Sequence, residues 1–92
     1  MYQVVKRDGK VVEFDLNKIA EAIKKAFDAT ATEYNDSIID FLALRVSADF
    51  LPKIKDGMIA VEDIQDSVES VLSRGGYDAV AKAYILYRKQ RE

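Results

Sequence analysis

The chain has 92 residues, of which 49% are hydrophobic and 33% are charged, and its formal net charge is −2. This length and composition predict one globular domain over residues 1–92, and the acidic balance argues against broad electrostatic binding of nucleic acid. Cysteine and histidine are absent, which excludes disulfides, thiolate metal sites, a cysteine nucleophile and a histidine base.

The first predicted element is a β-hairpin within residues 2–14. Two β-rich runs flank Asp8-Gly9, and Asp-Gly between such runs is a strong signal for a two-residue turn, because both turn positions need positive φ. This turn would pair Val5 with Val12, so that Val5, Val12 and Phe14 share one face. We expect that face to pack on a helical core.

After the hairpin the hydrophobic residues recur at the helical spacing of three and four. The first predicted helix follows Asp15, which suits the N-cap position. A second helix is predicted from near Asn35 to about Leu51, where Pro52 ends it. Its apolar residues cover more than one face, so we expect a central helix with several neighbouring elements.

A short third strand beside the hairpin is possible at residues 58–60, just after a predicted turn. A third helix begins near Val61 and is closed by Gly75-Gly76, and a fourth runs from Tyr77 to about Gln90. Together the elements predict an α+β fold, a four-helix cluster capped by an N-terminal β-hairpin. No run approaches the roughly 20 apolar residues of a membrane span, so we expect a cytoplasmic setting without membrane contact.

Basic side chains near the start of the first helix are candidates for binding an anion. Lys18 falls in the first helical turn, where the helix dipole disfavours a lysine by about 0.3–1 kcal/mol unless an anion offsets it. A phosphate would do so, and the hairpin should bring Lys6 or Arg7 to the same region. Adjacent strand residues point to opposite faces, so one of these two would lead and the other would contribute from the rim. The alternative is that all three are solvated surface charges.

Other polar and aromatic residues also have both a functional and a structural explanation. Gln65 is either a hydrogen-bonding partner of a base or ribose, or a solvated helix residue. Tyr77, Tyr84 and Tyr87 could stack on adenine, but their helical spacing favours core packing. Acidic residues at the start of the third helix are ordinary partners of the helix dipole rather than a metal site. Neither a Walker-type glycine loop nor a dinucleotide fingerprint is present.

Three runs of the sequence resemble the ATP-cone domain in order and spacing. They lie at residues 4–19, 61–69 and 81–88, so the resemblance spans essentially the whole chain. It implies that ATP or dATP lies under the hairpin and against the helices, together with Mg²⁺ held mainly by phosphate oxygens.

Matching motif positions carry the nucleotide-binding residues of the family over to this sequence. The basic ones would contact phosphates, and Asp15 with nearby backbone groups would help to read the adenine or sugar. Val61 departs from the threonine often found there, so the resemblance implies that a hydroxyl contact to the nucleotide would be lost. Arg88 and Arg91 are alternatives for one basic residue of the last helix. The implied set is Lys6, Arg7, Val12, Glu13, Phe14, Asp15, Leu16, Asn17, Lys18, Val61, Gln65, Arg88 and Arg91.

In the ATP-cone family the domain is an activity switch of ribonucleotide reductase, which ATP keeps active and dATP turns off by changing how subunits associate. The resemblance implies an allosteric domain without catalytic residues or metal ligands of its own. Its partners would be adenine nucleotides, the remainder of the reductase large subunit and the oligomeric partners of that subunit. One alternative is the nucleotide-sensing domain of a repressor of reductase genes, which would need a zinc ribbon that this sequence lacks. A small kinase is disfavoured because no phosphate loop and no paired catalytic acids are present.

Overall fold

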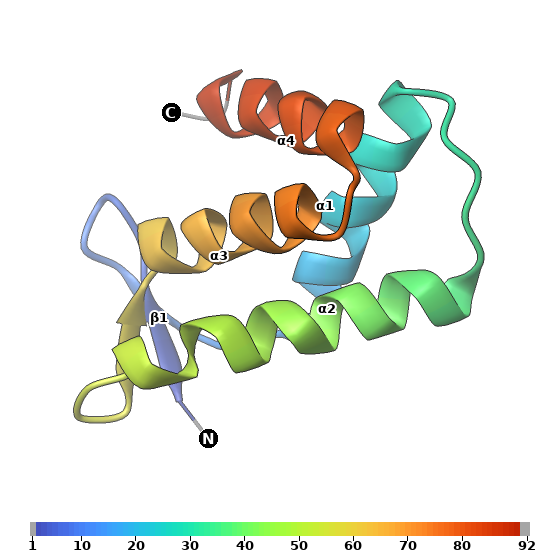
Figure 1. The fold of residues 1–92 in the computed structure, drawn as a ribbon. Helices are drawn as coiled ribbons and strands as arrows, with labels where there is room; N and C mark the ends of the chain where they lie inside the picture. Colours follow the sequence, from blue (N-terminus) through green and yellow to red (C-terminus); the bar gives the residue numbers. More distant parts are fainter. Residues whose placement is uncertain (1, 91–92) are drawn as a thin grey trace.

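The computed structural model describes residues 2–90, which form four helices and a three-stranded sheet (Figure 1). The predicted α+β class and the short third strand are confirmed. In chain order the elements are β1 (Gln3–Val5), β2 (Val11–Glu13), α1 (Leu16–Ala29), α2 (Asp36–Phe50), a 3-10 turn (Leu51–Lys53), β3 (Met58–Ala60), α3 (Val61–Arg74) and α4 (Asp78–Gln90).

The sheet has the strand order β2-β1-β3, so the first strand of the chain lies in the centre. Strand β1 pairs antiparallel with β2 and parallel with β3, and Val4 lies opposite both Val12 and Ile59. The sheet sits beside the N-terminus of α3 and the C-terminus of α2 (Figure 1). This position leaves the β1–β2 hairpin facing the start of α1 and the helices behind it.

The register predicted for the hairpin was wrong by one residue. The Lys6 amide donates to the Lys10 carbonyl at 2.8 Å and the Gly9 amide donates to the Lys6 carbonyl at 2.9 Å, so the loop holds three residues instead of two. Gly9 adopts φ +87°, the left-handed residue that follows a type I turn in such loops. The Asp8 carboxylate stabilises this turn by accepting from the Lys10 amide at 3.0 Å.

A one-residue shift in register exchanges the two faces of a strand. Val4, and not Val5, is therefore the buried residue of β1. Val4 and Lys6 point to the same side, together with Val12 across the ladder. The shift thus brings a lysine onto the face that packs against the helices.

An aromatic cluster fixes the base of the hairpin to α2. The ring of Phe50, at the end of α2, lies 5.7 Å from that of Phe14 and 5.9 Å from that of Tyr2, while Tyr2 and Phe14 are 4.6 Å apart. Phe50 is fully buried. Because edge-to-face and tilted ring pairs have preferred geometries, this cluster sets the angle at which the hairpin leaves the helices.

The helix boundaries follow the capping residues of the sequence. The Asp15 carboxylate accepts from the Asn17 amide at 3.0 Å at the start of α1, and the Asn35 side chain accepts from the Ile38 amide at 2.9 Å at the start of α2. Each of these bonds satisfies an amide that the first helical turn leaves without a partner. Within residues 2–90, no helix combines the length and the apolar character that a bilayer crossing requires.

The expectation that α2 is central was wrong. One face of α2 is buried against α1 and α3, but Phe41 and Leu44 on the other face are 57% and 59% exposed. Figure 1 shows α2 along one side of the bundle rather than between its neighbours. The several apolar faces of its sequence therefore include one that no element among residues 2–90 covers.

A polar contact joins α2 to α3. The Arg74 guanidinium donates to the Asp49 carboxylate. The buried Ser67 hydroxyl and the Arg74 guanidinium together hold the pKa of the Asp49 carboxyl below its ordinary value of 3.8, against the opposing effect of burial.

The lowered pKa of Asp49 predicts a stability contribution that acid removes. A carboxyl whose pKa is lower in the folded protein stabilises it above the ordinary pKa, and that contribution is lost as the pH falls through the folded value. We expect Asp49→Asn to reduce the free energy of unfolding by about 1 kcal/mol at neutral pH. Urea unfolding of both proteins should show this difference shrinking below about pH 4; a difference that stays constant from pH 7 to pH 2.5 would contradict it.

Candidate functional site

A cavity of about 260 Å³ opens where the hairpin meets α1, α3 and α4. Its walls are apolar and include two tyrosine rings of α4. The apolar lining consists of Val4, Val12, Phe14, Ile19, Ala22, Val61, Ile64, Val68, Tyr84 and Tyr87. The polar lining consists of the exposed residues Lys6, Glu13, Asp15 and Lys18 and the half-buried residues Gln65 and Arg88. An apolar interior with a charged margin is typical of ligand sites.

Two lysines and a helix N-terminus bring positive charge to the lining of this cavity. Lys18 belongs to the first turn of α1, which contains no acidic side chain. The amides at this end of the helix add the positive end of the helix dipole. Lys6 reaches the same cavity from the end of β1. These groups can interact with an anion, although the carboxylates of Glu13 and Asp15 line the same cavity.

Arg88 of α4 also lines the cavity and is held by α3. One guanidinium nitrogen donates to Asp66 at 2.8 Å and also to Glu69, and only 17% of the side chain is exposed. Burial would lower the pKa of Arg88, but the two carboxylates outweigh it and raise the pKa above its ordinary value. Arg88 is thus a permanent cation.

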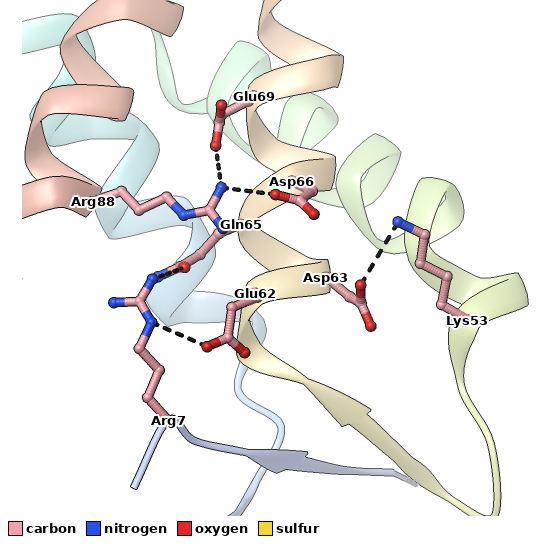
Figure 2. Close-up of polar contacts among 8 residues, drawn as sticks. All are labelled: Arg7, Lys53, Glu62, Asp63, Gln65, Asp66, Glu69 and Arg88. Carbon is pink, nitrogen blue, oxygen red and sulfur yellow. Dashed lines mark hydrogen bonds and ion pairs between the residues drawn. The ribbon is translucent and has the colours of Figure 1, made fainter. Parts of the chain in front are cut away.

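Arg7 lies at the rim, outside the cavity lining, and connects the hairpin turn to α3. Its Nε donates to Glu62 at 3.1 Å and its terminal nitrogen donates to Gln65 at 2.8 Å. Figure 2 shows Arg7 and Arg88 against the same side of α3, while Lys53 approaches Asp63 from the other side. Two arginines from different parts of the fold are therefore anchored on one helix.

Within residues 2–90, no group of three carboxylates is arranged to hold a metal ion. The carboxylates of α3 instead pair with arginine and lysine side chains.

The family model described as the ATP cone domain matches residues 2–92. The chain belongs to the ATP-cone family. The ATP-cone is similar to parts of several reductases that differ in their named cofactor and substrate.

Three relatives illustrate the range of these reductases. This ATP-cone is 39% identical to ribonucleoside-diphosphate reductase subunit alpha of Chlamydia pneumoniae, over 96% of the chain and 9% of the relative. It is 38% identical to a vitamin B12-dependent ribonucleoside-diphosphate reductase of Mycobacterium tuberculosis, over 97% of the chain and 12% of the relative. It is 36% identical to an anaerobic ribonucleoside-triphosphate reductase of Haemophilus influenzae, over 99% of the chain and 13% of the relative. The ATP-cone therefore spans about a tenth of the length of these relatives.

The structure brings most of the residues predicted for the ATP-cone site to one cavity. Arg7 is at the rim, where it contacts α3. Leu16 packs against the core and Asn17 is exposed, and neither lines the cavity. Arg91 lies outside the described residues. The predicted residues that do line the cavity are Lys6, Val12, Glu13, Phe14, Asp15, Lys18, Val61, Gln65 and Arg88.

Most of the apolar residues that line the ATP-cone cavity were not among the predicted site residues. Ile64 and Val68 of α3 have the spacing of core residues, and so does Tyr84 of α4. Tyr84 is a core residue and also part of the cavity wall, because it is almost fully buried and lines the cavity. Its burial raises the pKa of the Tyr84 hydroxyl to about 12. Tyr77 packs against the core, with its ring centre 5.2 Å from that of Phe27, and does not line this cavity. Helical spacing identifies a buried face but does not tell a core from a cavity wall.

Proposed function

We propose that this ATP-cone binds ATP or dATP in the cavity under the hairpin and thereby regulates a ribonucleotide reductase. The observation that carries the proposal is the convergence of Lys6, Lys18 and Arg88 around one apolar cavity. These three cations come from the residue that follows β1, the first turn of α1 and the last turns of α4. Membership of the ATP-cone family and the reductase relatives support the same function.

The lining supports a division of the ligand between base and phosphates. The apolar walls and the rings of Tyr84 and Tyr87 suit a flat purine, and Glu13 and Asp15 offer acceptors for an amino group or a sugar hydroxyl. The cavity is slightly smaller than the roughly 300–1,000 Å³ of clefts that bury most of a ligand. We therefore place the base and sugar inside and the phosphates at the rim, beside Lys6 and Lys18.

Mg²⁺ would accompany the triphosphate through the phosphate oxygens, because Mg²⁺ is usually bound by few protein ligands together with substrate phosphates. Binding would act on the remainder of the reductase large subunit and on the association of its subunits. ATP and dATP differ by one ribose hydroxyl, so their opposite effects require different affinities for two assemblies. The relatives described above are all reductases, which favours this role over that of a gene repressor.

Calorimetric titration of the 92-residue chain with nucleoside triphosphates tests the proposal. We expect ATP and dATP to bind and CTP and UTP to bind at least about tenfold more weakly, since a smaller ring leaves part of the apolar wall uncovered at a cost of about 1–3 kcal/mol. Equal affinities for all four would show that charge alone attracts them. Absence of heat with ATP and dATP would refute binding.

A further inference from the structure

Helix α3 presents a line of carboxylates to the same side as the candidate site. Glu62, Asp66 and Glu69 are spaced by four and three residues, which places them on one face of a helix. Glu62 pairs with Arg7, and Asp66 and Glu69 pair with Arg88. Asp63 points to another side of α3 and pairs with Lys53 at 3.9 Å. Lys53 does not line the cavity.

The charges around the cavity do not favour a polyanion in this arrangement. The cations are Lys6, Lys18 and Arg88 in the lining and Arg7 at the rim. The carboxylates are Glu13 and Asp15 in the lining, together with Glu62, Asp66 and Glu69 of α3. Four positive charges therefore lie beside five negative ones. The formal charge of this group is −1. A polyphosphate that approaches it gains little unless some of the carboxylates withdraw.

The hydrogen-bonding capacity of Arg88 leads to the same conclusion. One of its terminal nitrogens donates to both Asp66 and Glu69. A phosphate oxygen that contacts this nitrogen has to compete with those two acceptors, because a guanidinium offers a fixed fork of donors.

We propose that the carboxylates of α3 act as an internal competitor for the phosphates. In this state Glu62, Asp66 and Glu69 hold the two arginines, and a bound polyphosphate displaces them. The exchange frees α3 from the hairpin turn at Arg7 and from α4 at Arg88. It therefore gives the bound and unbound states different contacts, as any ligand-dependent switch requires. This inference rests on the proposed function and adds a regulatory contact at the same site.

A positioning role for Asp66 and Glu69 would predict the opposite change in phosphate affinity. If Asp66 and Glu69 only oriented Arg88 toward the ligand, their removal would weaken binding, as the loss of supporting partners does at other sites. The sign of the change in affinity therefore separates a competitor from a positioning residue.

The test measures the affinity of the 92-residue chain for inorganic tripolyphosphate and for ATP by calorimetry, in the parent and in three variants. We expect Asp66→Asn to bind tripolyphosphate about three- to tenfold more tightly than the parent, and Asp66→Asn/Glu69→Gln to bind more tightly still. Asp63→Asn is the matched control, since it removes the same charge from the same helix beside a lysine outside the cavity. The affinity of Asp63→Asn for tripolyphosphate should stay within about twofold of that of the parent. Asp66 is 56% exposed, so its replacement leaves the core intact.

Each outcome separates the inference from the proposed function. Equal tightening by Asp63→Asn and Asp66→Asn would attribute the effect to net charge and overturn the inference, as would unchanged or weaker binding by Asp66→Asn. If ATP binds the parent but this ranking is missing, the inference fails and the proposed function stands. If tripolyphosphate gives the expected ranking while ATP binds no better than tripolyphosphate, the base is not recognised, and the proposed function fails while the competition stands. No binding of either ligand would reject both.

Discussion

Replacing Lys18 by glutamate is expected to weaken ATP binding by roughly 50- to 100-fold, or about 2–3 kcal/mol. Lys18 lines the cavity from the first turn of α1, and the substitution places a negative charge where phosphates would bind. The same substitution suits the helix dipole better than lysine does. The fold should therefore survive, and circular dichroism should give a melting temperature at or above that of the parent.

The matched control is Lys24→Glu, the same change of charge on the same helix. Lys24 does not line the cavity, and its ion pair with Asp36, at 3.7 Å, is largely exposed. We expect the affinity of the Lys24→Glu variant for ATP to fall by less than about threefold, since screened surface charges act weakly over distance. Calorimetric curves that coincide for Lys18→Glu and the parent would remove Lys18 from the site.

The largest expected effect on stability comes from Phe50→Ala. Phe50 is 0% exposed and joins the base of the hairpin to α2 through its contacts with Tyr2 and Phe14. Truncating a buried phenylalanine costs about 3–5 kcal/mol through lost burial and the cavity that remains. At about 4–8 °C per kcal/mol for a domain of this size, the melting temperature should fall by roughly 15–30 °C.

Phe41→Ala provides the comparison for this prediction, because it removes the same side chain from the same helix. Phe41 is 57% exposed, so its loss should cost less than about 1 kcal/mol. A pair of denaturation curves decides the matter. Similar midpoints for Phe41→Ala and Phe50→Ala would mean that the buried aromatic cluster does not hold the hairpin in place.

Local signals in the sequence predicted most elements of the fold correctly. Asp15 caps α1 as predicted, because an N-cap is a contact between residues two or three positions apart. Helix α2 begins close to its predicted start near Asn35, which the structure shows to be its N-cap. The register of the hairpin was not predicted correctly. The choice between a two- and a three-residue loop depends on the Asp8 side chain and on pairing with β3, a strand more than 50 residues away. Local turn preferences do not include that distant pairing.

The candidate site shows a similar division between local and distant information. The position of Lys18 in a first helical turn can be read from the sequence. The pairing of Arg88 with Asp66 and Glu69 cannot, because it depends on how α3 and α4 pack across 19 and 22 residues. The exposed face of α2 was also unpredictable, since apolar residues on several faces do not reveal which of those faces the same chain covers.

The direct connection between β3 and α3 has a mechanical consequence. Ala60 is both the last residue of the strand and the N-cap of the helix, so no flexible segment separates them. The hydrogen-bonded ladders across β1 join the hairpin to that strand. The orientation of the sheet therefore fixes the direction in which α3 leaves it. Any rotation of the sheet would have to carry the start of α3 with it, including Val61 and Gln65 of the cavity wall.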